Sequence, residues 1–128
     1  MKKVFFGLFT VTTIIFFGFT NKEKIKSLKL GKTAPLKETK MKDVSGENLS
    51  LSDIKKENGL LVIFTCNTCP FVVGSDNNEG WEGRYNTIYD IASKNKIGMA
   101  LINSNEGKRD GADSYEAMKK RSNEQQYK

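Results

Sequence analysis

The 128-residue chain contains no histidine and only two cysteines. The absence of histidine excludes a hydrolase in which an imidazole base activates a cysteine nucleophile. Attachment of haem through C-x-x-C-H is excluded as well, because Pro70 follows the second cysteine. A zinc ion needs four ligands, and two thiolates combined with two carboxylates would be an unusual set. We therefore expect neither a metal nor a cofactor.

A strongly basic surface is also lacking. The chain has 21 Lys and Arg residues against 15 Asp and Glu, a net charge of +6. The basic residues are dispersed, are densest in residues 22–32, and form no stripe with interleaved aromatic residues. We therefore expect no nucleic-acid partner.

The N-terminus has the layout of an export signal. A basic head, residues 1–3, precedes an uncharged apolar run, residues 4–20, and polar residues follow. The run is short for a membrane span and has no clear A-x-A cleavage motif after it, so a cleaved signal peptide and an N-terminal membrane anchor both stay open. We expect export to the periplasm or another extracytoplasmic compartment, a polar linker over residues 21–34 and one folded domain over residues 35–128.

Both cysteines directly follow an apolar run. Residues 60–65 read LLVIFT, which predicts a strand buried on both faces, as in a parallel or mixed sheet. Next come Cys66 and Cys69 in a C-x-x-C motif. A helix beginning here would place Cys66 at its positive end, which favours the thiolate, and Cys69 one turn further in. Cys66 is therefore the candidate nucleophile and Cys69 the candidate resolving thiol.

Four neighbours complete the candidate site as supporting residues. Thr65 precedes the motif, Asn67 and Thr68 lie within it, and Pro70 follows it. Pro70 suits the first helical turn, where no intrahelical N–H bond is needed. A purely structural disulfide is the competing hypothesis, but a bridge across two residues constrains little of the unfolded chain. The placement therefore favours a reactive pair.

The remaining pattern predicts an α/β domain. Residues 41–51 alternate around the turn residues 45–48, which indicates an edge hairpin, and Ser50 or Ser52 is placed to cap a helical turn over residues 53–57. Apolar spacing predicts a helix from Trp81 whose core face contains five residues: Trp81, Tyr85, Ile88, Tyr89 and Ala92. A second buried strand over residues 97–102 would then be parallel to the first. Asp113 and Glu116 form a capping box for a last helix that ends near Gln126.

These residues resemble the thioredoxin-like redoxins, a superfamily that includes thioredoxins, tethered thiol-disulfide oxidoreductases and the alkyl hydroperoxide reductase/thiol-specific antioxidant proteins. The resemblance covers residue 31 to the end and is carried by the following blocks: Gly31 with Ala34-Pro35, D-x-x-G-x-x-L-x-L-x-D over residues 43–53, FTCNTCPFV over residues 64–72, INSNE over residues 102–106 and DSYEAMK over residues 113–119. It implies that Cys66 attacks and Cys69 resolves. Similar proteins often carry His before the second cysteine, where this chain has Thr68.

The same resemblance implies a C-terminal β-hairpin, a closing helix and a cis-proline that faces the cysteines. Pro35 and Pro70 are the only prolines, and neither matches that position. We therefore expect the N-terminal part of a thioredoxin-like fold, lacking the C-terminal hairpin and helix, in a chain that is a piece of a longer redoxin. The strand over residues 60–65 would then expose an apolar edge.

Three functions are compatible with these residues. The first is an exported thiol-disulfide oxidoreductase that acts on client protein disulfides or thiols and is recharged by a membrane or soluble thiol reductant. The second is a thiol peroxidase, but its Pro-x-x-x-Thr-x-x-Cys signature is absent, because Ile63 stands three residues before Cys66. The third is a non-catalytic, membrane-tethered module with an inert disulfide.

Overall fold

The computed structural model describes residues 27–128. Residues 33–128 form one compact unit, and every helix and strand named below belongs to it. The apolar run of residues 4–20 lies outside the described residues. Within residues 27–128, no helix has the length and apolar character required to cross a bilayer.

The unit begins with the predicted hairpin. Strands β1 (Met41–Lys42) and β2 (Asn48–Leu49) pair antiparallel, with Met41 opposite Leu49. In the turn, the carboxylate of Asp43 accepts a hydrogen bond from the Ser45 N–H at 2.9 Å, and Gly46 adopts a φ of +100°. That backbone conformation is accessible to glycine at little cost, so the turn sequence dictates the hairpin.

Helix α1 (Leu51–Ile54) follows the hairpin directly. Ser50 is its N-cap and forms a capping box with Asp53, so the prediction of Ser50 as a cap is confirmed. The prediction of a helical turn over residues 53–57 is wrong. Lys56 and Gly59 instead pair across a tight turn, with Gly59 at a φ of +121°, and this turn leads into the next strand.

The second sheet is a parallel pair. Strand β3 (Leu60–Thr65) pairs with β4 (Gly98–Asn103), and helix α3 (Tyr85–Lys94) connects them. The predicted parallel strands joined by a helix are thus confirmed, with β4 one residue later than expected. Position 98, the first residue of β4, requires glycine because a Cβ there would collide with the backbone carbonyl of Ile54.

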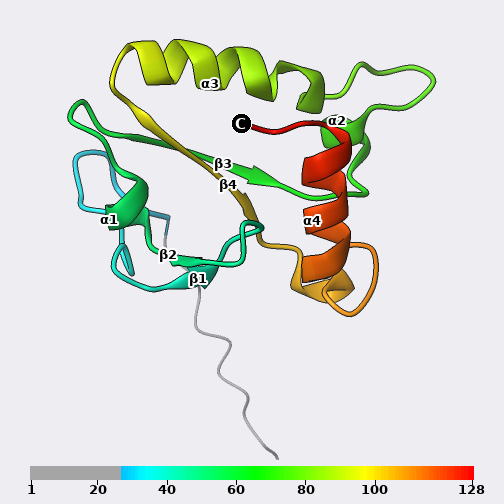
Figure 1. Ribbon diagram of the computed structural model, residues 1–128, viewed down its shortest axis with the longest axis horizontal. Helices are drawn as coiled ribbons and strands as arrows, with labels where there is room; N and C mark the ends of the chain where they lie inside the picture. The colour runs from blue at the N-terminus through cyan, green and yellow to red at the C-terminus, as the bar shows by residue number, and fades with distance from the viewer. Residues whose placement is uncertain (1–26) are drawn as a thin grey trace, which may run out of the picture. The chain divides into compact units, whose positions relative to one another are not determined.

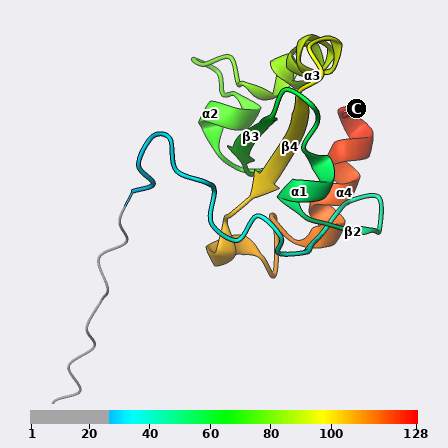
Figure 2. The same ribbon diagram turned by 90° about the vertical axis from the view of Figure 1, so that its left-hand side faces the viewer.

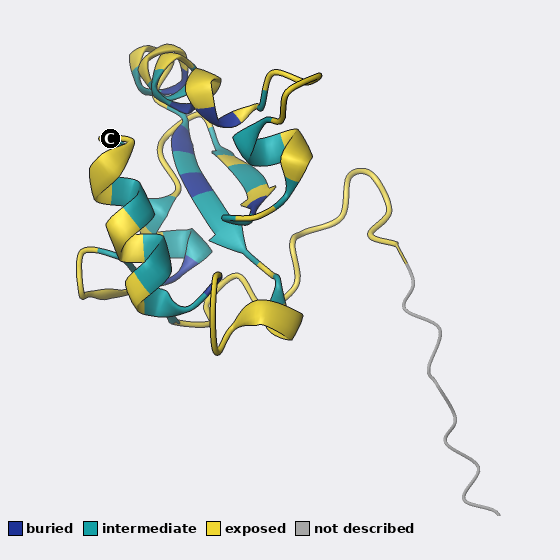
Figure 3. Cartoon of the chain, turned by 90° about the vertical axis from the view of Figure 1, so that its right-hand side faces the viewer, coloured by how far each residue is buried: buried dark blue, intermediate teal, exposed yellow. Residues whose placement is uncertain are grey.

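Helices α1, α2, α3 and α4 lie around the parallel pair of β3 and β4 (Figures 1 and 2). Helices α3 and α1 both contact β4, and the carboxyl ends of β3 and β4 point towards α2 and α4 (Figure 1). The buried apolar side chains are Tyr85 and Ala92 on α3 and Ala100 on β4. Figure 3 shows this buried band on β4 and α3. The described residues therefore form a mixed α/β unit with two small sheets.

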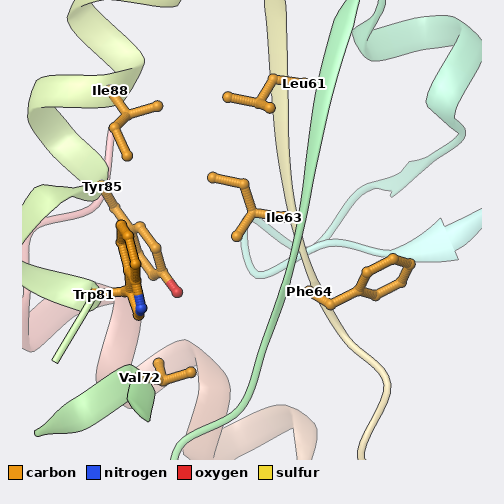
Figure 4. Close-up of a pocket in the computed structure, with 7 residues that line it drawn as sticks. All are labelled: Leu61, Ile63, Phe64, Val72, Trp81, Tyr85 and Ile88. Atoms are coloured by element: carbon orange, nitrogen blue, oxygen red, sulfur yellow. The ribbon is translucent and has the colours of Figure 1, made fainter.

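Strand β3 is less buried than predicted. Phe64 exposes 69% of its surface and Leu61 exposes 37%, and only Thr65 of the six residues is buried. Phe64 points away from the side of β3 that faces α3 (Figure 4), and among the described residues β3 has β4 as a partner along one edge and no strand along the other. The prediction of a strand buried on both faces is wrong, whereas an exposed apolar edge was expected.

The helix predicted from Trp81 starts later. A 3-10 helix (Glu82–Arg84) precedes α3, and Trp81 lies before it with 56% of its surface exposed. Tyr85 and Ala92 occupy the core face as predicted, but Trp81 does not. The core-facing stripe is therefore shorter than the apolar spacing indicated.

Helix α4 (Tyr115–Glu124) forms the C-terminal side of the unit. Its N-cap is Ser114, whose side chain accepts a hydrogen bond from the Ala117 N–H, so the predicted cap at Asp113 is wrong. Arg121 on α4 forms a two-pronged ion pair with the buried Glu82, at 2.9 and 2.6 Å. This pair fixes α4 to the segment that precedes α3.

Candidate thiol site

The two cysteines lie at the carboxyl end of β3. Both are free thiols, and both are half-buried. Helix α2 (Pro70–Val73) begins after them, with Cys69 as its N-cap. The predictions that Cys66 sits at the helix terminus and Cys69 one turn inside the helix are therefore wrong. Since proline disfavours the helical conformation in the residue before it, Cys69 is extended, with φ −77° and ψ 122°.

Pro70 occupies the first position of α2, as predicted. Its carbonyl accepts hydrogen bonds from the Gly74 N–H and from the Asn78 side chain, both at 3.0 Å. The loop then closes on α2, because the Trp81 N–H donates to the Phe71 carbonyl at 3.0 Å. Gly80 passes so close to the backbone of α2 that a Cβ would collide with the Val72 carbonyl. Pro70 thus anchors the segment that follows the cysteines.

Thr65 anchors the segment that precedes them. Its side chain is buried at the end of β3 and accepts a hydrogen bond from the Tyr85 hydroxyl at 3.2 Å. The first residue of α3 is therefore bonded to the residue immediately before Cys66. This contact also satisfies two buried hydroxyl groups, which would otherwise destabilise the folded state.

Asn67 connects the motif to the loop between β4 and α4. Its backbone N–H donates to Asp113 Oδ1 at 2.6 Å, and its side-chain Nδ2 donates to the Ala112 carbonyl at 2.9 Å. The exposed Thr68 accepts a hydrogen bond from Lys108 Nζ at 3.0 Å. Both residues between the cysteines are thus held from the same loop.

Asp113 is the residue on which these contacts converge. It is buried, with 3% of its surface exposed, and it also accepts bonds from Asn103 Nδ2 at 2.9 Å and Asn105 Nδ2 at 2.6 Å. Burial acts to raise the pKa of Asp113. The hydrogen bonds from Asn67, Asn103 and Asn105, together with the positive charge of Lys108, outweigh burial and hold the pKa below its ordinary value.

The sequence reasoning missed Asp113, Asn103 and Asn105 as parts of this site. One signal for Asn103 was present, since the ends of neighbouring parallel strands lie at the same edge of a sheet. Asn103 pairs in register with Thr65, so it lies at the same end of the sheet as Cys66, the residue after Thr65. The sequence offered no comparable signal for Asp113, whose pattern with Glu116 indicated a helix cap.

An apolar hollow of about 390 Å³ lies along β3, and neither cysteine is part of its lining. Figure 4 shows Leu61 and Ile63 facing Tyr85 and Ile88 across it, while Phe64 points to the other side of the strand. Val72 and Trp81 also line the hollow. Its lining contains apolar and aromatic side chains and ends two residues before Cys66.

Residues 27–128 contain no group of three or more Cys, Asp or Glu side chains placed to hold a metal ion. Comparisons with known proteins give no relative: no family model, curated protein or solved structure matches the chain.

Proposed function

We propose that the chain is a thiol-disulfide oxidoreductase of thioredoxin-like fold, with Cys66 as the nucleophile and Cys69 as the resolving thiol. The observation that carries this proposal is the placement of two free, half-buried thiols at the end of a parallel strand, in a loop anchored on both sides. Partial exposure lets another sulfur approach, and only two residues separate the two thiols in the anchored loop.

The exchange has two steps. Cys66, as its thiolate, attacks one sulfur of a client disulfide, so that a Cys66–client bond forms and the client S–S bond breaks. The released client thiolate takes up a proton. Cys69 then loses its proton and attacks the Cys66 sulfur, which forms the Cys66–Cys69 disulfide and releases the second client thiol. Two electrons pass from the pair to the client, and a membrane or soluble thiol reductant returns them.

Three further features support this proposal. The strand, helix and parallel strand that surround Cys66 agree with the thioredoxin-like arrangement that the resemblance implies. The apolar hollow beside β3 suits an extended, apolar client segment, because such a segment would bury Leu61 and Ile63 as it approached Cys66. The N-terminal sequence also has the layout of an export signal, which agrees with a reaction outside the cytoplasm, where client disulfides are abundant.

A trapping experiment tests the proposal. The Cys69→Ser variant, mixed with a disulfide-bonded client such as insulin, should accumulate a mixed disulfide on Cys66, because the resolving thiol is missing. The Cys66→Ser variant should accumulate far less, and mass spectrometry of the non-reduced adduct reports both. Equal, negligible adduct formation in both variants would contradict the proposal. Peroxide consumption by the reduced chain without thiol-disulfide exchange would favour the peroxidase function instead.

A further inference from the structure

We propose that Asp113 is a positioning residue of the thiol site, which fixes the Cys66–Cys69 loop through the Asn67 N–H and thereby sets the redox potential of the pair. This inference rests on the proposed function, because it concerns the same two thiols. Asp113 lies 46 positions after Asn67 in the chain, and its carboxylate accepts a hydrogen bond of 2.6 Å from the Asn67 backbone N–H.

The carboxylate is suited to this role because all three of its partners are donors. The Asn67 N–H and the side-chain amides of Asn103 and Asn105 all point at its two oxygens. The orientation of Asn103 is itself fixed, since its Oδ1 accepts a hydrogen bond from the Asn105 N–H at 2.9 Å. An amide at position 113 has one acceptor oxygen and would turn an N–H group towards the Asn105 amide, so Asn105 would have to reverse its own amide to keep a bond. A carboxylate accepts all three bonds with the donors in the orientations that they have.

The bond from Asn67 to Asp113 also determines which acceptor the backbone N–H next to Cys66 can bind. Asn67 follows the nucleophile directly, and its N–H is committed to Asp113. That N–H is therefore withheld from the Cys66 sulfur, and the loop is tied to the end of β4 through Asn103. Breaking the bond releases the loop and allows this N–H to reorient. The redox potential should then move towards the value of an unconstrained C-x-x-C segment.

The first test compares Asp113→Asn with Asp110→Asn. Asp110 is exposed and lies in the same loop, so its substitution makes the same change in charge without breaking the network. We expect Asp113→Asn to shift the equilibrium constant of the pair by about tenfold towards the value in urea, which corresponds to about 30 mV. Asp110→Asn should shift it less than twofold. A folded Asp113→Asn protein with an unchanged potential would overturn the proposal.

The second test needs no substitution and covers the case in which Asp113→Asn does not fold. In amide NMR spectra of the full wild-type chain, the Asn67 N–H resonance should titrate in acid as Asp113 takes up its proton, with Lys108 as the cation that faces it. An Asn67 resonance that does not move would contradict the positioning role.

The experiments can contradict the oxidoreductase function and the positioning role of Asp113 independently of each other. If the pair shows no exchange with clients while the Asn67 resonance still titrates with Asp113, the oxidoreductase function fails and the anchoring bond stands. If exchange proceeds and neither the resonance nor the potential depends on Asp113, the positioning role fails and the function stands. The Asp113→Glu variant keeps a carboxylate, so its redox potential should lie closer to the wild-type value than that of Asp113→Asn. This comparison separates the loss of the charge and of the acceptor oxygen from a general disturbance of the loop.

Discussion

The Tyr85 hydroxyl donates a hydrogen bond to Thr65 Oγ1 at 3.2 Å, between two side chains that are both buried. This bond joins the first residue of α3 to the last residue of β3, directly before Cys66. The helix that connects the two parallel strands is thereby fixed at the thiol end of the sheet. The thiol loop is anchored on its other side by Asp113, so two distant segments hold it.

Tyr85→Phe tests the Thr65 contact. The substitution keeps the ring in the core, removes the hydroxyl and leaves Thr65 without its partner, so we expect unfolding to become easier by about 1 kcal/mol. Thr65→Val should have a similar effect. Urea unfolding of the double variant should give a loss smaller than the sum of the two. Additive losses would show that the two hydroxyls do not interact.

Arg121→Met tests the ion pair between α4 and Glu82. It removes the cation and leaves a buried carboxylate without its two hydrogen bonds, so we expect a loss of about 2–3 kcal/mol in the free energy of unfolding. Lys120→Met is the matched control on the same helix, because Lys120 and Glu124 are exposed and 3.8 Å apart, and the expected loss is below about 0.5 kcal/mol. Equal losses in the two variants would contradict the role of Arg121.

Tyr127 should make stability depend on pH in the alkaline range. Burial, followed by the nearby Glu82 carboxylate, raises the pKa of the Tyr127 hydroxyl above its ordinary value of 10.0. The unfolded chain therefore loses this proton first, so the stabilisation is complete below pH 10 and is lost as the pH rises towards the folded-state pKa. Urea unfolding at about pH 8 and about pH 11 should show a smaller alkaline loss in Tyr127→Phe than in the wild type. Tyr89→Phe is the control and should keep the wild-type loss.

The sequence predicted the parts of the fold that depend on neighbouring residues. The hairpin follows from the turn around Gly46, and the parallel pair follows from two apolar runs separated by a helical pattern. The start of α2 was predicted wrongly although its cause is local, since Pro70 keeps Cys69 out of the helix. The exposure of Phe64 depends instead on which elements cover its side of β3, and the apolar run gives no information on that.

The candidate site was predictable only in part. The motif identified Cys66 and Cys69, together with neighbours that prove to be anchor points, namely Thr65, Asn67, Thr68 and Pro70. The groups that hold those points come from positions up to 46 residues away, and their contacts exist only in the folded chain. Asp113 was interpreted as a helix cap because its spacing to Glu116 fits one, while Ser114 takes that role.

The equilibrium redox potential of the Cys66–Cys69 pair tests the central claim most directly. It is measured by alkylation and mass counting across a series of thiol/disulfide buffers, with and without urea. We predict a folded-state value between about −120 and −270 mV, displaced from the value in urea, because the anchored loop tunes the pair for exchange. A folded-state value below about −300 mV would mark a structural disulfide and contradict the account, and so would identical values with and without urea.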